Sequence, residues 1–190
     1  LDGEFINLSD GRVYPEFDAR RHVSMAFPVR DDDVIYVGCD FNAGLNAHCC
    51  IIDRGGRLFI VSCGHWNYVG EGPRKLREAF LTNRIIMIPD VNGKEIMSGF
   101  MEEVEEAGIE LFWNNVNPPV LERITAINRL FRSDKLSIFA PEGDEGRSRM
   151  VMGFETRDFD DMGKPRKGKG IDAPDHLNDS SEYAIWHIIH

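Results

Sequence analysis

The stretch VIYVGCDFN, residues 34–42, decides how this chain of 190 residues folds. Its apolar run, residues 34–39, is typical of a buried strand and ends abruptly at Asp40. A second apolar run, residues 47–52, is followed by DRGGR and then by LFIVSC, residues 58–63. Two apolar runs joined by a glycine pair predict a β-hairpin. We therefore expect three strands in series, the first of which carries an aspartate at its end.

Helices and strands alternate in the rest of the sequence. Apolar runs predict strands over residues 85–89, 109–113 and 136–140, and helices are predicted over residues 72–81, 98–108, 117–131 and 145–159, with a last helix beginning near residue 175. Asn117 is suited to cap the helix over residues 117–131. The apolar stripe of that helix consists of Val120, Ile124, Ile127 and Phe131. Hairpins followed by helical crossovers imply an α/β fold, with a mixed sheet and helices on both faces.

The composition is that of a globular domain, with 42% hydrophobic and 28% charged residues. No apolar run approaches the ~20 residues that span a bilayer, so we expect no membrane partner. Residues 1–33 carry few periodic signals and are rich in Asp, Gly and Pro, which predicts an extended arm or linker before a domain over residues 34–190. Because the chain opens with Leu1 rather than Met, we expect a fragment of a longer protein.

The charge distribution limits how the chain can contact nucleic acid. Its formal net charge of −10 repels a phosphate backbone at long range, so contact with DNA requires a local basic patch. The densest positive stretch is GKPRKGKG, residues 163–170, which contains Lys164, Arg166, Lys167 and Lys169. We interpret these four residues as candidate phosphate contacts, and a solvated loop is the alternative.

Several common site chemistries are excluded by the sequence. There is no GxSxG nucleophile motif and no GxxxxGK[ST] phosphate loop, so the chain as given does not hydrolyse ATP through a P-loop. The cysteines show no CxxC spacing, and they are Cys39, Cys49, Cys50 and Cys63. We interpret them as small core residues in a reducing compartment, with a disulfide as the less favoured alternative.

Three carboxylates are candidates for a metal site. Asp40 and Asp90 each end a predicted strand, and parallel neighbouring strands would bring both to the sheet edge at which ligands bind. The last helix could place Asp179 beside them. Oxygen ligands without cysteine favour Mg²⁺ or Mn²⁺, and two such ions ~4 Å apart can hold a scissile phosphate and activate a water. Taken singly, Asp40 and Asp90 are equally compatible with ordinary turn residues.

The last helix carries further polar candidates. Asp175 and Asp179 are four residues apart and lie on one helix face. Asp175 is suited to be the N-cap, which makes Asp179 the preferred ligand of the pair. His176 can orient a carboxylate or ligate directly. We interpret Glu182 as a solvated surface residue.

Together these segments resemble the C-terminal nuclease domain of the large terminase subunit of tailed double-stranded DNA bacteriophages, over most of the chain. GRVYPEFD, residues 11–18, looks like the segment that joins the family's ATPase domain to its nuclease. YVGCDFN and IPDVNGK are similar to the two strands that carry the first and second acid. The most specific parts are the Asn-Pro helix, NNVNPPVLERITAINRLF, and DHLNDSSEY, which is similar to a closing motif usually written DHLNDALGY. Ser180, Ser181 and Glu182 depart from that motif.

The resemblance implies an RNase H-like fold and metal-dependent cleavage of double-stranded DNA during viral genome packaging, by two-metal hydrolysis. Asp40, Asp90 and Asp179 would be the metal-binding acids, with Asp40 bridging two Mg²⁺ or Mn²⁺ ions, and Asp175 and His176 would be auxiliaries. The implied partners are double-stranded DNA, an N-terminal terminase ATPase domain, the phage portal protein and the small terminase subunit. The implied location is the host cytoplasm rather than the mature virion.

Two alternatives remain open from the sequence. The first is another RNase H-like nuclease, such as a junction resolvase or a transposase core, which would use the same acids on a different DNA structure. The second is a non-catalytic module that docks on the portal, in which the acids are structural. The Asn-Pro helix and the closing motif favour the terminase, whereas the net negative charge is compatible with the docking module.

Overall fold

The computed structural model describes residues 11–41, 46–91, 93–113, 116–168 and 173–190, and these form a seven-stranded sheet. The strands are β1 (Val23–Ser24), β2 (Val34–Phe41), β3 (Asn46–Asp53), β4 (Leu58–Trp66), β5 (Arg84–Pro89), β6 (Ile109–Leu111) and β7 (Leu136–Phe139). The helices are α1 (Ala19–His22), α2 (Glu71–Ala79), α3 (Gly93–Ser98), α4 (Met101–Glu106), α5 (Val120–Arg132), α6 (Glu145–Thr156) and α7 (Pro174–Ile189). The strand order is β1-β7-β4-β3-β2-β5-β6.

The sheet confirms the predicted meander and its parallel neighbour. Strands β2, β3 and β4 pair in antiparallel succession, and β5 lies parallel to β2 on the other side. The hairpin between β3 and β4 turns at Gly55 and Gly56, whose φ angles of +65° and +80° lie in the left-handed region that glycine enters readily. The Gly56 N–H donates to Asp53 Oδ1 at 2.8 Å and closes the turn. The α/β class with a mixed sheet is therefore confirmed.

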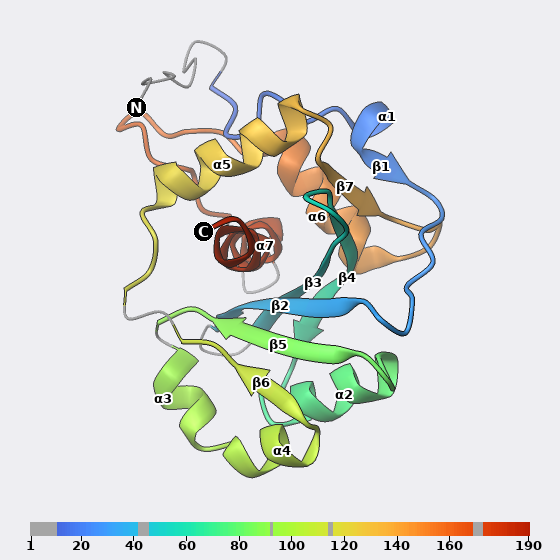
Figure 1. The fold of residues 1–190 in the computed structure, drawn as a ribbon. Coiled ribbons are helices and arrows are strands. Elements are labelled where there is room, and N and C mark those ends of the chain that lie inside the picture. Colours follow the sequence, from blue (N-terminus) through green and yellow to red (C-terminus); the bar gives the residue numbers. More distant parts are fainter. Residues whose placement is uncertain (1–10, 42–45, 92, 114–115, 169–172) are drawn as a thin grey trace.

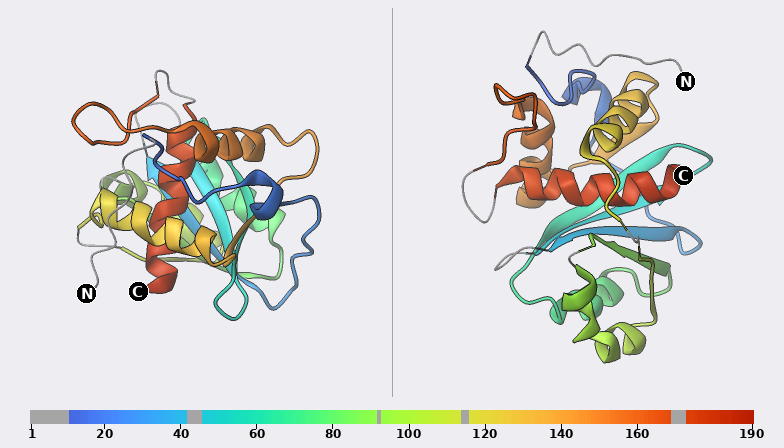
Figure 2. Two further views of the ribbon diagram at one scale, coloured as in Figure 1. Left: turned by 90° about the horizontal axis from the view of Figure 1, so that it is seen from above. Right: turned by 90° about the vertical axis from the view of Figure 1, so that its left-hand side faces the viewer.

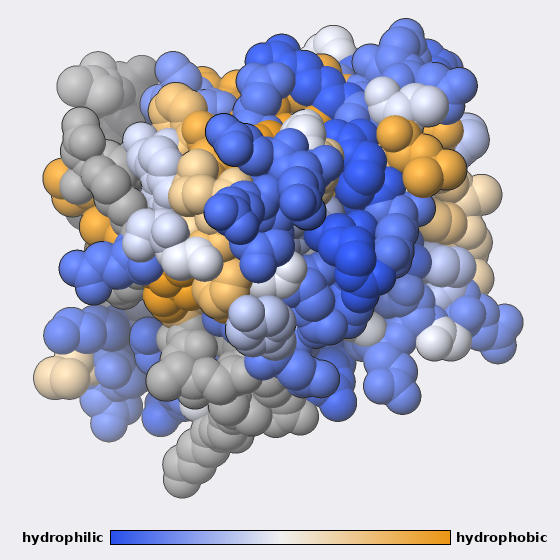
Figure 3. All heavy atoms as spheres, turned by 90° about the horizontal axis from the view of Figure 1, so that it is seen from below, coloured by the Kyte–Doolittle hydropathy of each residue, from blue (hydrophilic) through white to orange (hydrophobic). Residues whose placement is uncertain are grey.

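The sheet is covered by helices on both faces, as predicted (Figure 1). Helix α7 lies across β2 and β3, and α5 and α6 pack outside it (Figure 2). Helices α2, α3 and α4 cover the opposite face, whose outer surface is mainly hydrophilic (Figure 3). Each layer has its own apolar core, one around Ile127 and Phe131 of α5 and one around Leu76 of α2. No helix among the described residues is long and apolar enough to cross a membrane.

Helix α5 differs from its prediction at the N-terminal end. Pro119, not Asn117, is the N-cap, because a proline restricts the residue before it to extended conformations and the helix can start only after the Pro-Pro pair. Asn117 instead accepts a hydrogen bond from the Val91 N–H at 2.9 Å. The rest of the predicted stripe is fully buried, but Val120 is 42% exposed because it starts the helix beyond the core.

Residues 11–33, which the sequence predicts as an arm outside the domain, pack onto it over their first half. The side chains of Val13, Tyr14 and Phe17 are at most 4% exposed and belong to the core beneath α5, α6 and α7. Strand β1 extends the sheet beside β7. The predicted boundary at residue 33 therefore does not hold. These apolar residues are too few and too irregularly spaced to produce a periodic signal.

The cysteines are free and buried, as the sequence predicts. Cys39 and Cys50 lie in the core beneath α2, and Cys49 and Cys63 lie in the core beneath α7. Burial raises the pKa of every one of these thiols, that of Cys50 to about 12, so all four remain protonated and behave as small apolar side chains.

Candidate active site

Asp40 and Asp90 lie at the ends of two parallel strands, as predicted. The register of β2 and β5 places Cys39 opposite Pro89, so that the next residue of each chain segment is the acid. The Asp90 N–H donates to the Cys39 carbonyl at 3.0 Å, and the Phe41 N–H donates to Asp90 Oδ1 at 3.5 Å. Asp40 is 9% exposed and Asp90 is 2% exposed. Two carboxylates buried this close together repel unless donors or a cation compensate their charge.

Helix α7 brings His176 and Asp179 to the same edge of the sheet. His176 Nδ1 lies 2.9 Å from Asp40 Oδ2. The hydrogen bond to Asp40 raises the pKa of His176, and this effect outweighs the opposite effect of burial. Asp179, one turn further along the helix, lines the same cleft as Asp40 and Asp90. The three acids predicted to bind metal therefore converge at one place.

Asp175 does not cap α7, contrary to the prediction. Ala173 is the N-cap and Pro174 takes the first helical position, which proline favours, so Asp175 falls within the first turn. It is 5% exposed, and its Oδ2 accepts the Gly168 N–H at 3.3 Å. Its Oδ1 has no hydrogen-bond partner among the described residues. Asp175 lines a small pocket of about 170 Å³ with Arg166, beside the main cleft rather than in it.

The main cleft has a volume of about 930 Å³ and combines acidic and basic side chains. Lys164 and Lys167, two of the predicted phosphate contacts, line it and are exposed to solvent. Arg166 lines the neighbouring small pocket and is paired with Asp158 at 3.2 Å. Lys169 lies outside the described residues. Two of the four predicted basic residues are thus placed where a phosphate beside the acids would lie.

Glu182 is buried, contrary to its interpretation as a solvated residue. Its side chain is 0% exposed and takes part in a network beneath the acids. Tyr14 donates its O–H to Glu182 Oε1 at 2.5 Å, and Arg123 Nη1 lies 3.2 Å from Glu182 Oε2. Arg157 Nη1 donates to Asp179 Oδ1 at 2.8 Å and lies 3.8 Å from Glu182 Oε1. Two arginines therefore compensate two carboxylates of α7.

The network shifts the protonation of its members. Burial, and then the charge of Asp179, raise the pKa of Glu182 to about 7, although Arg123 and Arg157 act in the opposite direction. Burial lowers the pKa of Arg157, but the nearby groups Tyr14, Asp179 and Glu182 outweigh it and the net shift is upward. Arg157 therefore stays charged at every relevant pH.

The sequence gives no signal for Tyr14, Arg123 and Arg157 as parts of the site. Tyr14 lies in the segment predicted as an arm, 168 residues from its partner Glu182. Arg123 lies on a helix whose apolar stripe explains its fold without reference to a site. Arg157 directly follows α6. Only the packing of four separate segments brings them together.

A divalent cation is the group that the resemblance implies, and the donor chemistry of the cleft fits it. Carboxylate oxygens without a cysteine ligand are the donors that Mg²⁺ and Mn²⁺ prefer. The geometry fits in part: Asp40 and Asp90 adjoin each other, whereas Asp179 is paired with Arg157. Within the described ranges, no group of three His, Cys, Asp or Glu side chains is arranged as a metal site. Two of the three acids are thus placed for a shared cation.

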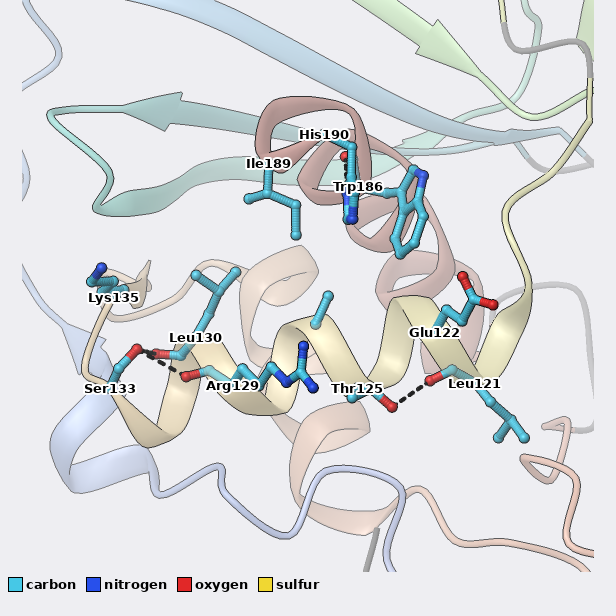
Figure 4. A pocket seen from close by; sticks show the side chains of 11 residues that line it. Leu121, Glu122, Thr125, Arg129, Leu130, Ser133, Lys135, Trp186, Ile189 and His190 are labelled. Carbon is cyan, nitrogen blue, oxygen red and sulfur yellow. Dashed lines mark hydrogen bonds between the residues drawn. The ribbon is translucent and has the colours of Figure 1, made fainter. Parts of the chain in front are cut away.

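A second groove, of about 750 Å³, lies on another part of the surface, between α5 and the C-terminal end of α7 (Figure 4). Its apolar lining includes Leu121, Leu130, Trp186 and Ile189, and the Trp186 ring stacks on His190 with centroids 3.8 Å apart. None of the three converging acids lines this groove. The chemistry of the molecule therefore points to the first cleft.

Asn117 supports the segment that follows Asp90. Replacing Asn117 by alanine removes the acceptor of the Val91 N–H, which we expect to lower the free energy of unfolding by about 1 kcal/mol. Asn117→Asp keeps an oxygen at this position and is expected to keep most of that stability. Urea unfolding of both variants measures the difference. Equal losses in the two variants would show that the hydrogen bond does not matter.

No protein-family model and no curated protein sequence matches the chain. Solved structures do match. The chain is similar to the full-length large terminase of a thermophilic bacteriophage, with a TM-score of 0.70, 17% identity, and coverage of 95% of this chain and 46% of that one. It is also similar to the P22 large terminase nuclease domain, with a TM-score of 0.66, 14% identity, and coverage of 91% and 90%.

A third similar structure is the large terminase nuclease from thermophilic phage G20c with bound magnesium. Its TM-score is 0.64 at 13% identity, with coverage of 93% of this chain and 97% of that one. The same G20c nuclease is also known with bound cobalt. The chain thus spans slightly less than half of the first of these three proteins but nearly all of the two nuclease domains. It has the RNase H-like fold of large terminase nuclease domains, as predicted.

Proposed function

We propose that this chain is a metal-dependent endonuclease domain that cuts double-stranded DNA during the packaging of a viral genome. One observation carries the proposal: Asp40, Asp90 and Asp179, from two parallel strand ends and the crossing helix, line one cleft with Lys164 and Lys167. The fold that holds them is shared with nucleases, one of which is known with bound magnesium. A junction resolvase or transposase core is a less favoured assignment, because the matched structures described above are large terminases or their nuclease domains.

The acids would hold the cations and the basic residues would hold the DNA. Asp40, Asp90 and Asp179 would bind Mg²⁺ or Mn²⁺, in our scheme as two ions, and Asp175 is an auxiliary. Such ions polarise a phosphoryl oxygen and lower the pKa of water. Lys164 and Lys167 would contact phosphates on either side of the scissile bond and fix the position of the duplex.

His176 would orient Asp40. Its Nδ1 is 2.9 Å from Asp40 Oδ2, and its raised pKa means that it keeps a proton on that nitrogen or exchanges it near neutral pH. A histidine that donates to a carboxylate fixes the rotamer of that carboxylate, which is the usual role of a group behind a ligand. Asp90 would be oriented by the Phe41 backbone N–H.

The wider assignment follows from the same resemblance. We propose that the chain works with an N-terminal terminase ATPase domain, the portal protein and the small terminase subunit, in the host cytoplasm. A net charge of −10 gives the isolated domain little affinity for DNA, so a partner that holds the DNA would raise its activity.

The proposal is tested with supercoiled plasmid incubated with the chain in Mn²⁺, Mg²⁺ or EDTA. We expect nicked and linear products with either metal and none with EDTA, and weaker cleavage as salt increases because phosphate contacts are screened. Calorimetry with Mn²⁺ accompanies the assay. No cleavage together with no bound metal would overturn the proposal in favour of a portal-docking module. No cleavage despite bound metal would point instead to a missing ATPase domain.

A further inference from the structure

The side chain of Arg157 lies between two carboxylates of α7. Its Nη1 is 2.8 Å from Asp179 Oδ1 and 3.8 Å from Glu182 Oε1. Asp179 and Glu182 are three residues apart, so they lie on the same side of the helix, one turn from each other. One guanidinium therefore has two acceptors within a short side-chain movement. It currently donates a hydrogen bond to only one of them, Asp179, among the interactions of this pair.

The backbone of Arg157 is fixed while its side chain has spare donor capacity. Its N–H donates to the Gly153 carbonyl at 3.1 Å, and its carbonyl accepts the Val13 N–H at 2.9 Å. Its Nε is buried and has no hydrogen-bond partner in the part of the chain that the structure describes. Buried donors without a partner are rare and call for an explanation. A second position of the guanidinium would supply one.

Glu182 is built to accept this cation. It is 0% exposed, and Tyr14 and Arg123 hold it from other segments. Its Oε2 makes no hydrogen bond within the described ranges, although Arg123 Nη1 is only 3.2 Å away. The second acceptor therefore has an unused lone-pair site, beside a donor that also lacks a hydrogen bond. Neither change requires the helix to move.

Pairing with Arg157 and binding of a divalent cation compete at Asp179. The guanidinium neutralises the carboxylate and repels a nearby cation. If Arg157 moves to Glu182, Asp179 regains its negative charge beside Asp40 and Asp90. We infer that Arg157 exchanges between Asp179 and Glu182, and that this exchange sets the affinity of Asp179 for a divalent cation. The inference rests on the proposed function, because it takes Asp179 as the third acid of the metal site.

The test compares Mn²⁺ binding by calorimetry for the wild type, Arg157→Gln and Glu182→Gln at mildly alkaline pH, at which Glu182 is ionised. Arg157→Gln removes the competitor, so we expect Mn²⁺ to bind roughly tenfold more tightly. Glu182→Gln removes the alternative acceptor and leaves Arg157 with Asp179, so we expect binding roughly tenfold weaker. A residue with only a structural role would not produce shifts in opposite directions.

Three controls keep the test decisive. Arg84→Gln removes one positive charge from an exposed pair with Glu110, outside the cleft, and should leave Mn²⁺ affinity unchanged. Arg157→Lys keeps the charge and should bind Mn²⁺ within about twofold of the wild type. Because Glu182→Gln leaves two buried arginines less compensated, its melting temperature in EDTA is measured first. Glu182→Asp keeps the charge but withdraws it from Arg157, and should also weaken binding.

The outcomes separate the two proposals. Wild-type binding of Mn²⁺ with unchanged affinity in Arg157→Gln, or with shifts in the same direction for both variants, would overturn the exchange and leave the nuclease proposal intact. A wild type that neither binds Mn²⁺ nor cleaves plasmid would overturn the proposed function and the exchange with it. Opposite shifts, with Arg84→Gln unchanged, would support both.

Discussion

Replacing Asp40 by asparagine is expected to lower metal-dependent plasmid cleavage by roughly 10³-fold or more. Loss of a group that merely supports a metal ligand typically costs about 10- to 100-fold in affinity or activity, so loss of a proposed ligand shared by both ions should cost more. Asparagine keeps the shape of aspartate and an oxygen that can accept from His176 Nδ1. The substitution therefore removes charge without removing packing.

The same change should leave the fold intact. Asp40 is 9% exposed and lies beside Asp90, so removing its charge relieves repulsion between two carboxylates instead of breaking an ion pair with an arginine. We expect a melting temperature in EDTA equal to or above that of the wild type. A lower melting temperature would mean that reduced cleavage reports unfolding.

Asp53→Asn is the matched control. Asp53 also ends a strand, β3, but lies in the hairpin next to Gly56 and is exposed. The chemical change is identical, while the distance from the cleft is set by the length of β3. We expect cleavage within about twofold of the wild type in this variant. Full cleavage by Asp40→Asn would show that the activity comes from another site or from a contaminant.

The acids could be predicted from the sequence because their positions follow from strand periodicity. An apolar run that stops at a carboxylate identifies both the strand and the edge of the sheet, and this holds for Asp40 and for Asp90. Asp179 could be predicted because its helix also carries a strong motif. In all three cases the chemical signal lies within a few residues of the structural one.

The supporting residues could not be predicted, for a physical reason. Arg123, Arg157 and Glu182 are charged residues in segments that look amphipathic, and in such segments charges are usually solvated. Their burial depends on one another: Glu182 is tolerated in the interior only because two arginines and Tyr14 surround it. Partnership between four distant segments leaves no local pattern. The same holds for Tyr14, whose burial depends on residues 11–17 packing against helices at the other end of the chain.

Gly38 is the position at which the proposed site depends most directly on the fold. A Cβ atom built on Gly38 would lie 1.9 Å from the Ser180 carbonyl oxygen and 3.0 Å from Ala184 Cβ. The first contact is with backbone, which cannot rotate away. Strand β2 and helix α7 therefore approach each other so closely that only glycine fits between them. The two small residues of α7 that face Gly38, Ser180 and Ala184, are both 0% exposed.

Replacing Gly38 by alanine is accordingly expected to lower the free energy of unfolding by about 3 kcal/mol or more. Overpacking of a tight core commonly costs about 1–3 kcal/mol, and a clash with backbone belongs at the upper end of that range or beyond it. The helix must shift away from β2, carrying His176 and Asp179 away from Asp40. Cleavage should therefore fall in the fraction that stays folded as well. Urea unfolding and plasmid cleavage measure the two effects separately.

Gly99→Ala is the matched control, because the nearest atom to its added Cβ is the Ile96 carbonyl oxygen at 3.6 Å, an ordinary contact. We expect this variant to unfold within about 0.5 kcal/mol of the wild type. If Gly38→Ala were as stable as Gly99→Ala, β2 and α7 could not be as close as the structure places them. Asp179 would then have no fixed position relative to Asp40, and the convergence of the acids, on which the nuclease proposal depends, would lose its structural basis.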